Sequence, residues 1–256
     1  MGTDHKNGNP AIELKDFAGH LSEKFGVRKI EPWSAHFPSI NPNYLGQLRT
    51  ALDRARGTVV NIAVDGNHCP YASDRAERDQ AIAFSKKWID VAVAIGSPSV
   101  RTNIPIAKGD AKPNLQYLAD SLRNVVEHAA AKATVVHLEN DNPLSEDPFF
   151  LAQLVEQVGS PWLRLLPDFC NTLAAHDEDY AYRAMDAMFA HGYGICHVKD
   201  SEVNGNGETV HVDLARTFEI LKRHSYKGYC SIEYDAPGDP YKATADLIEK
   251  TERYLA

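Results

Sequence analysis

Seven short apolar segments alternate with eight longer amphipathic segments along almost the whole chain of 256 residues. The apolar segments are rich in β-branched residues and are bounded by Gly, Pro, Asn, Asp or Ser, as strands usually are. They span residues 27–33, 58–65, 99–104, 134–140, 162–169, 194–200 and 229–235. The amphipathic segments have the helical period, and they span residues 11–25, 41–55, 73–96, 114–132, 147–158, 177–190, 213–224 and 241–255. This alternation predicts parallel strands joined by right-handed helical crossovers.

The order of segments predicts one α/β domain over residues 1–256, folded as a (β/α)8 TIM barrel, which typically needs about 250 residues. The sequence is one strand short of eight, so we expect the first strand to be missing, very short or replaced by another chain. Residues 1–10 are polar and are expected to form a flexible leader. A doubly wound open sheet is the competing architecture, but the glycine-rich turn that usually follows its first strand is absent from the sequence.

Two helix starts and one helix end can be predicted from single residues. Asn41 is a capping residue, and Pro42 suits the first helical position. Either Ser73 or Asp74 is expected to cap the next helix, and Gly96 to end it.

Composition excludes several classes of protein. The formal net charge of −8 argues against a nucleic-acid partner, which requires a basic surface. No apolar run reaches the length of about 18 residues that a membrane helix needs, and the N-terminus lacks the apolar stretch of a signal peptide. The four cysteines are far apart and form no CxxC pair. We therefore expect reduced thiols in a cytoplasmic protein.

The ends of the last four predicted strands each carry one side chain that can bind a metal. These side chains are Glu139, Asp168, His197 and Glu233, and they follow one another at intervals of 29, 29 and 36 residues. Each interval is about one strand-plus-helix unit, so a parallel barrel would bring all four to its C-terminal rim, where barrel active sites lie. Side chains alternate along a strand, and this alternation also allows the four to point into the barrel.

Three carboxylates and one imidazole suit one divalent metal ion: Mn²⁺, Mg²⁺ or Co²⁺, with Zn²⁺ as a further choice. Such an ion would also offset the repulsion between buried acids. Taken singly, each residue has an ordinary explanation, because a strand-terminal Asp often caps a helix and a strand His often packs in the core. The matched positions on four consecutive units favour a joint metal site.

The chain resembles the xylose-isomerase-like family of sugar phosphate isomerases and epimerases. The resemblance covers roughly residues 26–236 and rests on stretches such as "KIEPWSAHF", "VVHLEN", "LRLLPDFCN", "ICHVKD" and "YCSIEYD". It implies that Glu139, Asp168, His197 and Glu233 bind one divalent metal ion. In similar ketose epimerases the two glutamates form a proton-transfer pair across the substrate, which implies catalytic roles for Glu139 and Glu233. Those epimerases often carry a histidine where this chain has Asn171.

The expected reaction is a metal-dependent isomerisation or epimerisation of a sugar or sugar phosphate. One glutamate removes a proton next to a carbonyl, an enediolate forms, and the other glutamate returns a proton. An inosose-type dehydratase would use the same enediolate with loss of water, and it remains an alternative. The residues expected to contact the sugar or polyol are Lys199, Arg101, Asn103, His68 and Asn171.

Two other interpretations are weighed against this one. An apurinic endonuclease with several zinc ions would need more histidines and a basic face, which the net charge disfavours. A non-catalytic sugar-binding or interaction subunit is the third interpretation, above all if the missing strand is a site of assembly. A homo-oligomer is compatible with the sequence, and neither a nucleic acid nor a membrane is an expected partner.

Overall fold

The computed structural model describes residues 12–106, 112–234 and 238–256, so the predicted leader and Asp235 lie outside the described residues. The described strands are β1 (Lys29–Ile30), β2 (Thr58–Val59), β3 (Ala63–Val64), β4 (Ser99–Thr102), β5 (Val135–Glu139), β6 (Leu163–Leu166), β7 (Ile195–Val198), β8 (Ser201–Val203), β9 (Thr209–His211) and β10 (Tyr229–Ile232). The helices are α1 (Leu14–Phe25), α2 (Pro42–Ala55), α3 (Arg75–Ile95), α4 (Leu115–Ala130), α5 (Pro148–Val158), α6 (Asn171–Ala175), α7 (Glu178–Ala190), α8 (Leu214–Arg223) and α9 (Pro240–Leu255).

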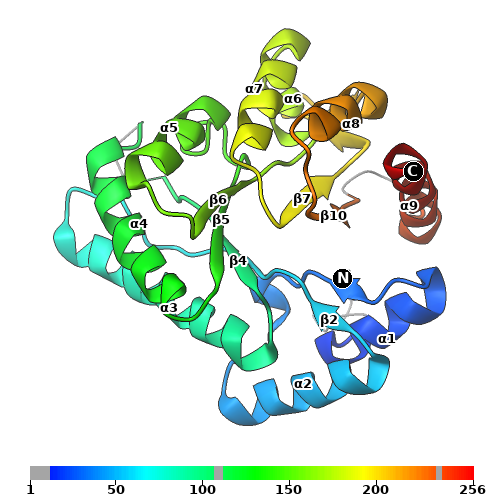
Figure 1. Ribbon diagram of the computed structural model, residues 1–256, viewed down its shortest axis with the longest axis horizontal. Helices are drawn as coiled ribbons and strands as arrows, with labels where there is room; N and C mark the ends of the chain where they lie inside the picture. Colours follow the sequence, from blue (N-terminus) through cyan, green and yellow to red (C-terminus); the bar gives the residue numbers. More distant parts are fainter. Residues whose placement is uncertain (1–11, 107–111, 235–237) are drawn as a thin grey trace.

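All described strands except β8 and β9 form a curved parallel wall, and the helices lie outside it (Figure 1). β1 pairs with β2, β3 to β6 pair in sequence order, and β7 pairs with β10, all in parallel. Single bridges from Trp33 to Ala63 and from Asp168 to His197 connect these groups. The wall therefore runs in chain order from β1 to β10, which confirms the predicted α/β barrel architecture.

In the part of the chain that the structure describes, the strands do not close into a complete ring. Among the described residues, no strand pairs with the second edge of β1 or of β10. The expectation that the first strand is missing or modified concerns the segment before α1, most of which lies outside the described residues, so it stays a prediction.

Helix ends follow the predicted capping residues. The side chain of Asn41 accepts a hydrogen bond from the Tyr44 backbone N–H at 2.8 Å, and Pro42 is the first residue of α2. Of the two candidates for α3, Asp74 is the cap. Gly96 ends α3 with a φ of 79°, a left-handed conformation that glycine adopts without steric cost.

Alternation along β5 separates the core from the barrel interior. Val136 and Leu138 are fully buried in the main apolar core between the strands and the helices. His137 and Glu139 point the other way, into the barrel, where Glu139 meets His197. This alternation is the one expected from the sequence, and it places acid groups on the inner wall.

The glycine-containing stretch 204–208 joins an antiparallel hairpin that was not predicted. β8 and β9 pair from Ser201↔His211 to Val203↔Thr209. Asn204 holds the turn through its side-chain oxygen, which accepts the N–H groups of Asn206 and Glu208. In the part of the chain that the structure describes, no helix has both the length and the apolar character needed to cross a membrane.

Glu146 connects two loops at the C-terminal ends of the strands, and its loss is expected to destabilise the fold. Its two carboxylate oxygens accept the N–H groups of Ile104 at 2.6 Å and Asn142 at 2.9 Å. Glu146→Ala leaves these donors without partners, so we expect the free energy of unfolding to fall by about 2–4 kcal/mol. Urea denaturation measures the change. The exposed control Glu156→Ala should alter it by less than about 0.5 kcal/mol, and an equal loss in both variants would refute this role.

Candidate metal and substrate site

Four acid or imidazole groups converge at the C-terminal ends of β5, β6, β7 and β10. One ligand atom from each of Glu139, Asp168, His197 and Glu233 lies within 4.8 Å of every other. Nδ1 of His197 is 2.7 Å from Glu139, 3.6 Å from Glu233 and 4.0 Å from Asp168. Glu139, Asp168 and His197 are buried, whereas the side chain of Glu233 is 38% exposed. The cluster is thus closed on three sides and open beside Glu233.

The carboxylate of Asp168 is fixed through one oxygen and leaves the other towards the cluster. Oδ1 accepts the backbone N–H groups of Cys170 at 2.8 Å and Asn171 at 2.7 Å. Oδ2 is buried and has no hydrogen-bond donor among the described residues. Burial raises the pKa of Asp168 above its ordinary value. The same oxygen, Oδ2, lies 3.5 Å from the Lys199 ammonium, so a cation bound in the cluster would share it with Lys199.

Asn140 holds the ends of β5 and β6 together beside this carboxylate. Its side-chain oxygen accepts the backbone N–H of Asp168 at 2.8 Å, and its amide donates to the Asp168 carbonyl at 3.1 Å. The same amide donates to Thr172 at 2.9 Å. The buried amide therefore sets the position of Asp168.

The imidazole of His197 lies between carboxylates on both of its nitrogens. Nδ1 faces the cluster, and Nε2 is 3.1 Å from Oε2 of Glu31. Burial by itself would lower the pKa of His197, but the carboxylates of Glu139, Glu233 and Glu31 outweigh it and raise that pKa well above its ordinary value. A cation in the cluster would replace the proton on Nδ1, while the N–H kept on Nε2 donates to Glu31.

Glu31 is the main site residue that the sequence reasoning missed. It follows β1, and its side chain is only 7% exposed. Its other oxygen accepts a hydrogen bond from Asn61 at 2.7 Å, and Asn61 in turn accepts one from Ser99 at 2.6 Å. The available signal was its position, since it follows Ile30 near the end of the predicted strand 27–33, as the four candidate ligands stand near the ends of theirs.

Arg101 supports Glu139 from the neighbouring strand. Its Nε lies 2.9 Å from Oε2 of Glu139, and its guanidinium also pairs with Asp65. Burial would raise the pKa of Glu139, but His197 and Arg101 outweigh it and lower that pKa to about 2. Glu139 is therefore ionised at neutral pH. Arg101, which was predicted to contact the substrate, lines the cleft and pairs with Glu139.

Lys199 approaches the same cluster from the end of β7. Its ammonium lies 3.1 Å from Glu233 and 3.5 Å from Asp168 and donates to the Asn171 side chain at 3.0 Å. Burial lowers the pKa of Lys199, but Asp168 and Glu233 outweigh it and raise that pKa. Two predicted substrate contacts, Lys199 and Asn171, thus sit beside the predicted ligands.

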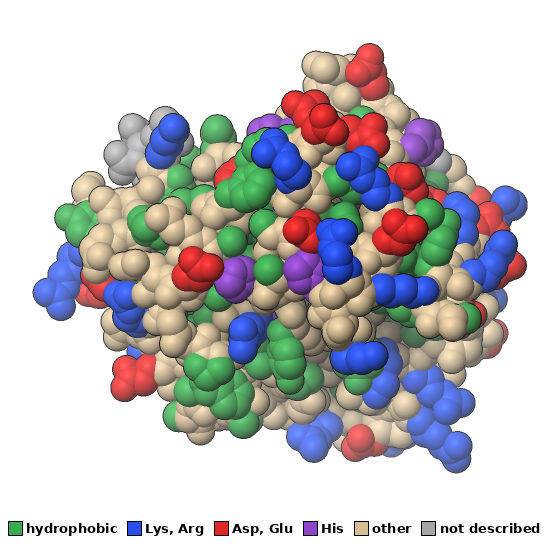
Figure 2. Space-filling view, turned by 45° about the horizontal axis from the view of Figure 1, so that its top comes forward, with side chains coloured by type: hydrophobic (Ala, Val, Ile, Leu, Met, Phe, Trp, Pro, Cys, Tyr) green, Lys and Arg blue, Asp and Glu red, His purple; other side chains and the backbone are tan. Residues whose placement is uncertain are grey.

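A cleft of about 1130 Å³ opens over the cluster and includes Glu139, Glu233, Arg101, Lys199 and Asn171 in its lining. On the face of the molecule in Figure 2, basic side chains are interspersed with acidic ones over much of the surface. The indole of Trp33 is 44% exposed at the cleft. An apolar ring beside several hydrogen-bonding groups is an arrangement suited to a polyhydroxylated ligand.

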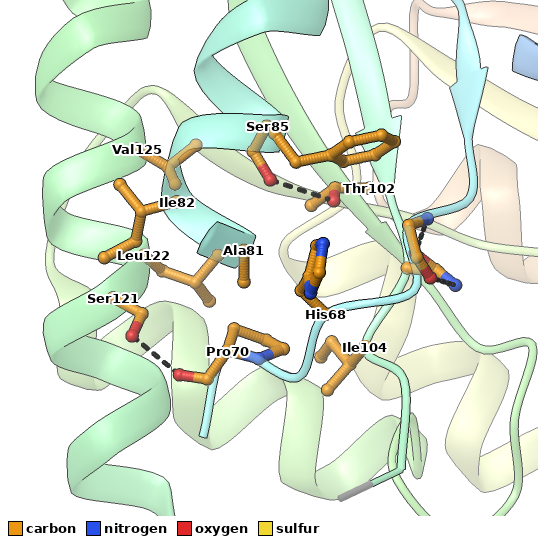
Figure 3. Close-up of a pocket in the computed structure, with 13 residues that line it drawn as sticks. His68, Pro70, Ala81, Ile82, Ser85, Thr102, Ile104, Ser121, Leu122 and Val125 are labelled. Atoms are coloured by element: carbon orange, nitrogen blue, oxygen red, sulfur yellow. Dashed lines mark hydrogen bonds between the residues drawn. The ribbon is translucent and has the colours of Figure 1, made fainter. Parts of the chain in front are cut away.

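His68 and Asn103 lie elsewhere, around a small separate cavity of about 20 Å³ between α3 and α4 (Figure 3). The His68 imidazole points into this cavity and lies 3.3 Å from Glu77. The side chain of Asn103 accepts the backbone N–H of Gly66 at 2.8 Å, which ties the loop after β3 to β4. The cavity has room for about one water molecule. Neither His68 nor Asn103 is in the lining of the cleft over the four converging groups.

The family model described as "Xylose isomerase-like TIM barrel" matches residues 20–251 of the chain. No curated protein sequence is similar enough to the chain to count as a match. Several solved structures are similar over nearly the whole chain. One is 3-keto-D-glucoside 4-epimerase, YcjR, from E. coli, with a TM-score of 0.75 and 17% identity over 98% of each chain.

Two further similar structures bear on sugars and metals. D-psicose 3-epimerase from Clostridium cellulolyticum H10, solved with D-tagatose, has a TM-score of 0.77 and 16% identity over 95% of this chain and 94% of its own. A xylose isomerase-like TIM-barrel protein from Mycobacterium smegmatis, in complex with magnesium, has a TM-score of 0.74 and 14% identity over 97% of this chain and 92% of its own. At such identities the likeness establishes a shared fold.

Proposed function

Because the chain belongs to the xylose isomerase-like TIM-barrel family, we propose that it is a divalent-metal-dependent isomerase or epimerase of a sugar or sugar phosphate. The observation that carries this proposal is the convergence of Glu139, Asp168, His197 and Glu233 within 4.8 Å. They come from four consecutive parallel strands and meet at the rim where barrel enzymes have their active sites.

The residues present fit a hard divalent cation. Oδ2 of Asp168 is buried, accepts no hydrogen bond from the described residues and lies 4.0 Å from Nδ1 of His197 in the cluster, and Glu31 orients His197 so that Nδ1 can act as a ligand. Three carboxylates with one imidazole suit Mn²⁺, Mg²⁺ or Co²⁺, and Zn²⁺ is also compatible. The complex of a similar barrel with magnesium supports a divalent cation as the ligand of this site.

A cation held there would polarise a substrate carbonyl and stabilise the negative charge that develops beside it. Glu139 and Glu233 are the outermost of the four groups in strand order, since Asp168 and His197 lie on the two strands between them. We assign the removal of a proton from carbon to one glutamate and its return to the other. The ionised state of Glu139 and the open side at Glu233 support these roles.

Arg101, Lys199 and Asn171 line the cleft beside the two glutamates, which supports roles in positioning rather than in proton transfer. Arg101 holds the Glu139 carboxylate, and Lys199 lies between Glu233 and the Asn171 amide. We propose that Lys199 and Asn171 bind substrate hydroxyl groups and that the exposed indole of Trp33 covers an apolar face of the sugar.

Solvent isotope exchange tests the proposal whichever product the reaction forms. The Mn²⁺-loaded protein is incubated in D₂O with D-tagatose, D-allulose, a 3-keto-D-glucoside and phosphorylated ketoses, the first three being sugars associated with similar structures. We expect deuterium to enter next to the carbonyl of at least one of them, together with a new isomer. Loss of water would identify a dehydratase instead. A sugar that binds but never exchanges would make the chain a binding subunit.

Glu31→Gln is expected to weaken metal binding. The amide can donate as well as accept at His197 Nε2, so it no longer fixes the Nδ1 lone pair towards the cluster. Loss of such a supporting carboxylate typically costs about 10–100-fold in metal affinity, and titration calorimetry with Mn²⁺ measures it. Glu252→Gln removes the same charge from the cleft lining at an exposed position on α9, and should change affinity by less than about threefold. Equal losses in both variants would mean that only net charge matters.

A further inference from the structure

Asp65 lines the cleft directly after β3, next to the strand that carries Arg101. Ala63 pairs in register with Arg101, and Arg101 pairs with His137, which faces the barrel interior. Side chains alternate along a strand, so Asp65, two residues after Ala63, belongs to the same inner face. The register of β3 and β4 therefore places a carboxylate beside the guanidinium of Arg101 at the C-terminal rim.

The two carboxylate oxygens of Asp65 accept hydrogen bonds from two different residues of the cleft. Oδ2 accepts the indole N–H of Trp33 at 2.7 Å, and Oδ1 accepts an N–H from the guanidinium of Arg101. A carboxylate can satisfy both donors at once, whereas an amide would turn its NH2 group towards one of them. The residue type at this position is therefore matched to its two partners.

The first partner, Trp33, is held at its backbone by neighbouring residues and at its ring by Asp65. Its backbone forms a parallel bridge to Ala63, and its backbone N–H donates to Nδ1 of His36 at 3.2 Å. Its indole is 44% exposed, so solvent borders much of the ring. The hydrogen bond to Asp65 fixes the polar edge of the indole, and with it the face that the ring turns towards a ligand.

The second partner, Arg101, connects Asp65 to the proton-transfer glutamate. Its guanidinium donates to Asp65, and its Nε lies 2.9 Å from Oε2 of Glu139. Because the guanidinium is planar, contacts at two of its nitrogens fix its plane. The Arg101 side chain is 9% exposed, so the two carboxylates also balance a charge that is largely removed from water. Loss of the contact to Asp65 would let the guanidinium turn, and Glu139 would lose a fixed partner.

We propose that Asp65 is a positioning residue that holds the indole of Trp33 and the Arg101–Glu139 pair in one arrangement. This role rests on the proposed function, in which Trp33 covers the sugar and Glu139 transfers a proton. Asp65 acts on sugar binding through the indole and on proton transfer through Arg101. A misplacement of reacting groups by about 1 Å can cost about 10²-fold in rate, so Asp65 affects the reaction without touching the reacting atoms.

Nuclear magnetic resonance of the ¹⁵N-labelled full-length chain tests the indole contact without a substrate. The chain has three tryptophans, so three indole N–H signals are expected, and Trp33→Phe identifies the signal of Trp33 by its loss. In Asp65→Asn the Trp33 signal should shift and exchange with solvent about tenfold faster, because a hydrogen bond to a charged acceptor is lost. The other two signals should stay in place. The control Glu252→Gln, the same chemical change on α9 in the same lining, should move none of them.

Steady-state kinetics with the ketose found by isotope exchange test both roles of Asp65. Trp33→Phe removes the indole N–H and should raise KM by about fivefold. Asp65→Asn should raise KM by a similar factor and in addition lower kcat by about tenfold, because it also releases Arg101. In the double variant the two KM effects should not multiply, since both substitutions remove the same hydrogen bond. A merely structural role would lower the active fraction and kcat without this coupling in KM.

The results that refute this role differ from those that refute the proposed function. If the wild type exchanges deuterium with no ketose, the proposed function fails, and the role of Asp65 fails with it. If the wild type is active but Asp65→Asn has the kinetics of Glu252→Gln, only the role of Asp65 fails. An unmoved Trp33 signal in Asp65→Asn, or KM effects that multiply, would refute it as well. Melting curves check that each variant is folded, and Asp65→Ser replaces Asp65→Asn if that chain does not fold.

Discussion

Glu233→Gln is expected to lower turnover of the sugar substrate by about 10³-fold or more while leaving the fold intact. The amide cannot accept a proton from carbon, and general acid–base groups of this kind contribute about 10²–10⁴-fold. Glu233 follows β10 at the open side of the cluster, and its side chain is 38% exposed. The fold therefore depends little on its charge. Steady-state kinetics with the substrate found by isotope exchange, together with a melting curve, provide the measurement.

Glu252→Gln is the matched control for Glu233. Glu252 lies in the same cleft lining on α9 and is exposed, but it is not among the four converging groups. The turnover of the Glu252→Gln variant should stay within about twofold of the wild-type turnover, as for an ordinary surface substitution. If Glu233→Gln keeps the turnover of the wild type, Glu233 has no part in the mechanism. The two glutamates would then not form a proton-transfer pair.

Asp168→Asn is expected to abolish stabilisation of the protein by Mn²⁺. The substitution keeps the oxygen that accepts the N–H groups of Cys170 and Asn171, but it replaces Oδ2, which faces the cluster, by an NH2 group that cannot bind a cation. At 100 times the dissociation constant, a ligand raises the free energy of unfolding by about 2.7 kcal/mol. The wild-type chain should gain this amount, and the variant should gain nothing measurable.

Thermal melts with and without Mn²⁺ measure this difference, with Asp200→Asn as control. Asp200 lies two residues after Val198, pairs with Lys250 and is not one of the converging ligands. Its variant should respond to Mn²⁺ as the wild type does. If Mn²⁺ stabilises Asp168→Asn as much as the wild type, the metal binds elsewhere and Asp168 is not a ligand.

Much of the fold was predictable because the hydrophobic pattern changes period at each element. Asn140 marks the end of the predicted strand 134–140, and Asp74 and Gly96 mark the ends of the predicted helix 73–96. Both elements are present, as β5 and α3. The hairpin of β8 and β9 was not predicted, because three-residue strands leave almost no periodic signal. Its Asn-Gly turn was the available clue.

The convergence of the four candidate ligands was predictable for a reason of topology. Parallel strands of similar length end at one rim, so matched positions on consecutive units become neighbours in space. Glu31 was not predicted as a site residue because its strand lies near the other end of the chain, 166 residues from His197. Barrel curvature brings the two together, and the order of strands along the sequence does not show that proximity.

Contacts between long side chains were the least predictable part of the site. Lys199 and Arg101 were expected to face substrate and both line the cleft, but their ion pairs with carboxylates of the cluster were not predicted. His68 and Asn103 were expected near the rim, and local contacts with Glu77 and Gly66 place them around another cavity. Such pairings depend on rotamers and on neighbouring strands, which a single sequence does not encode in any periodic form.

Anomalous diffraction from a crystal soaked with Mn²⁺ tests the central claim most directly. The account predicts one strong manganese peak per chain, about 2.0–2.2 Å from oxygens of Glu139, Asp168 and Glu233 and from Nδ1 of His197. A crystal saturated with Mn²⁺ that shows no peak between these four groups, or a peak held by other residues, would contradict it.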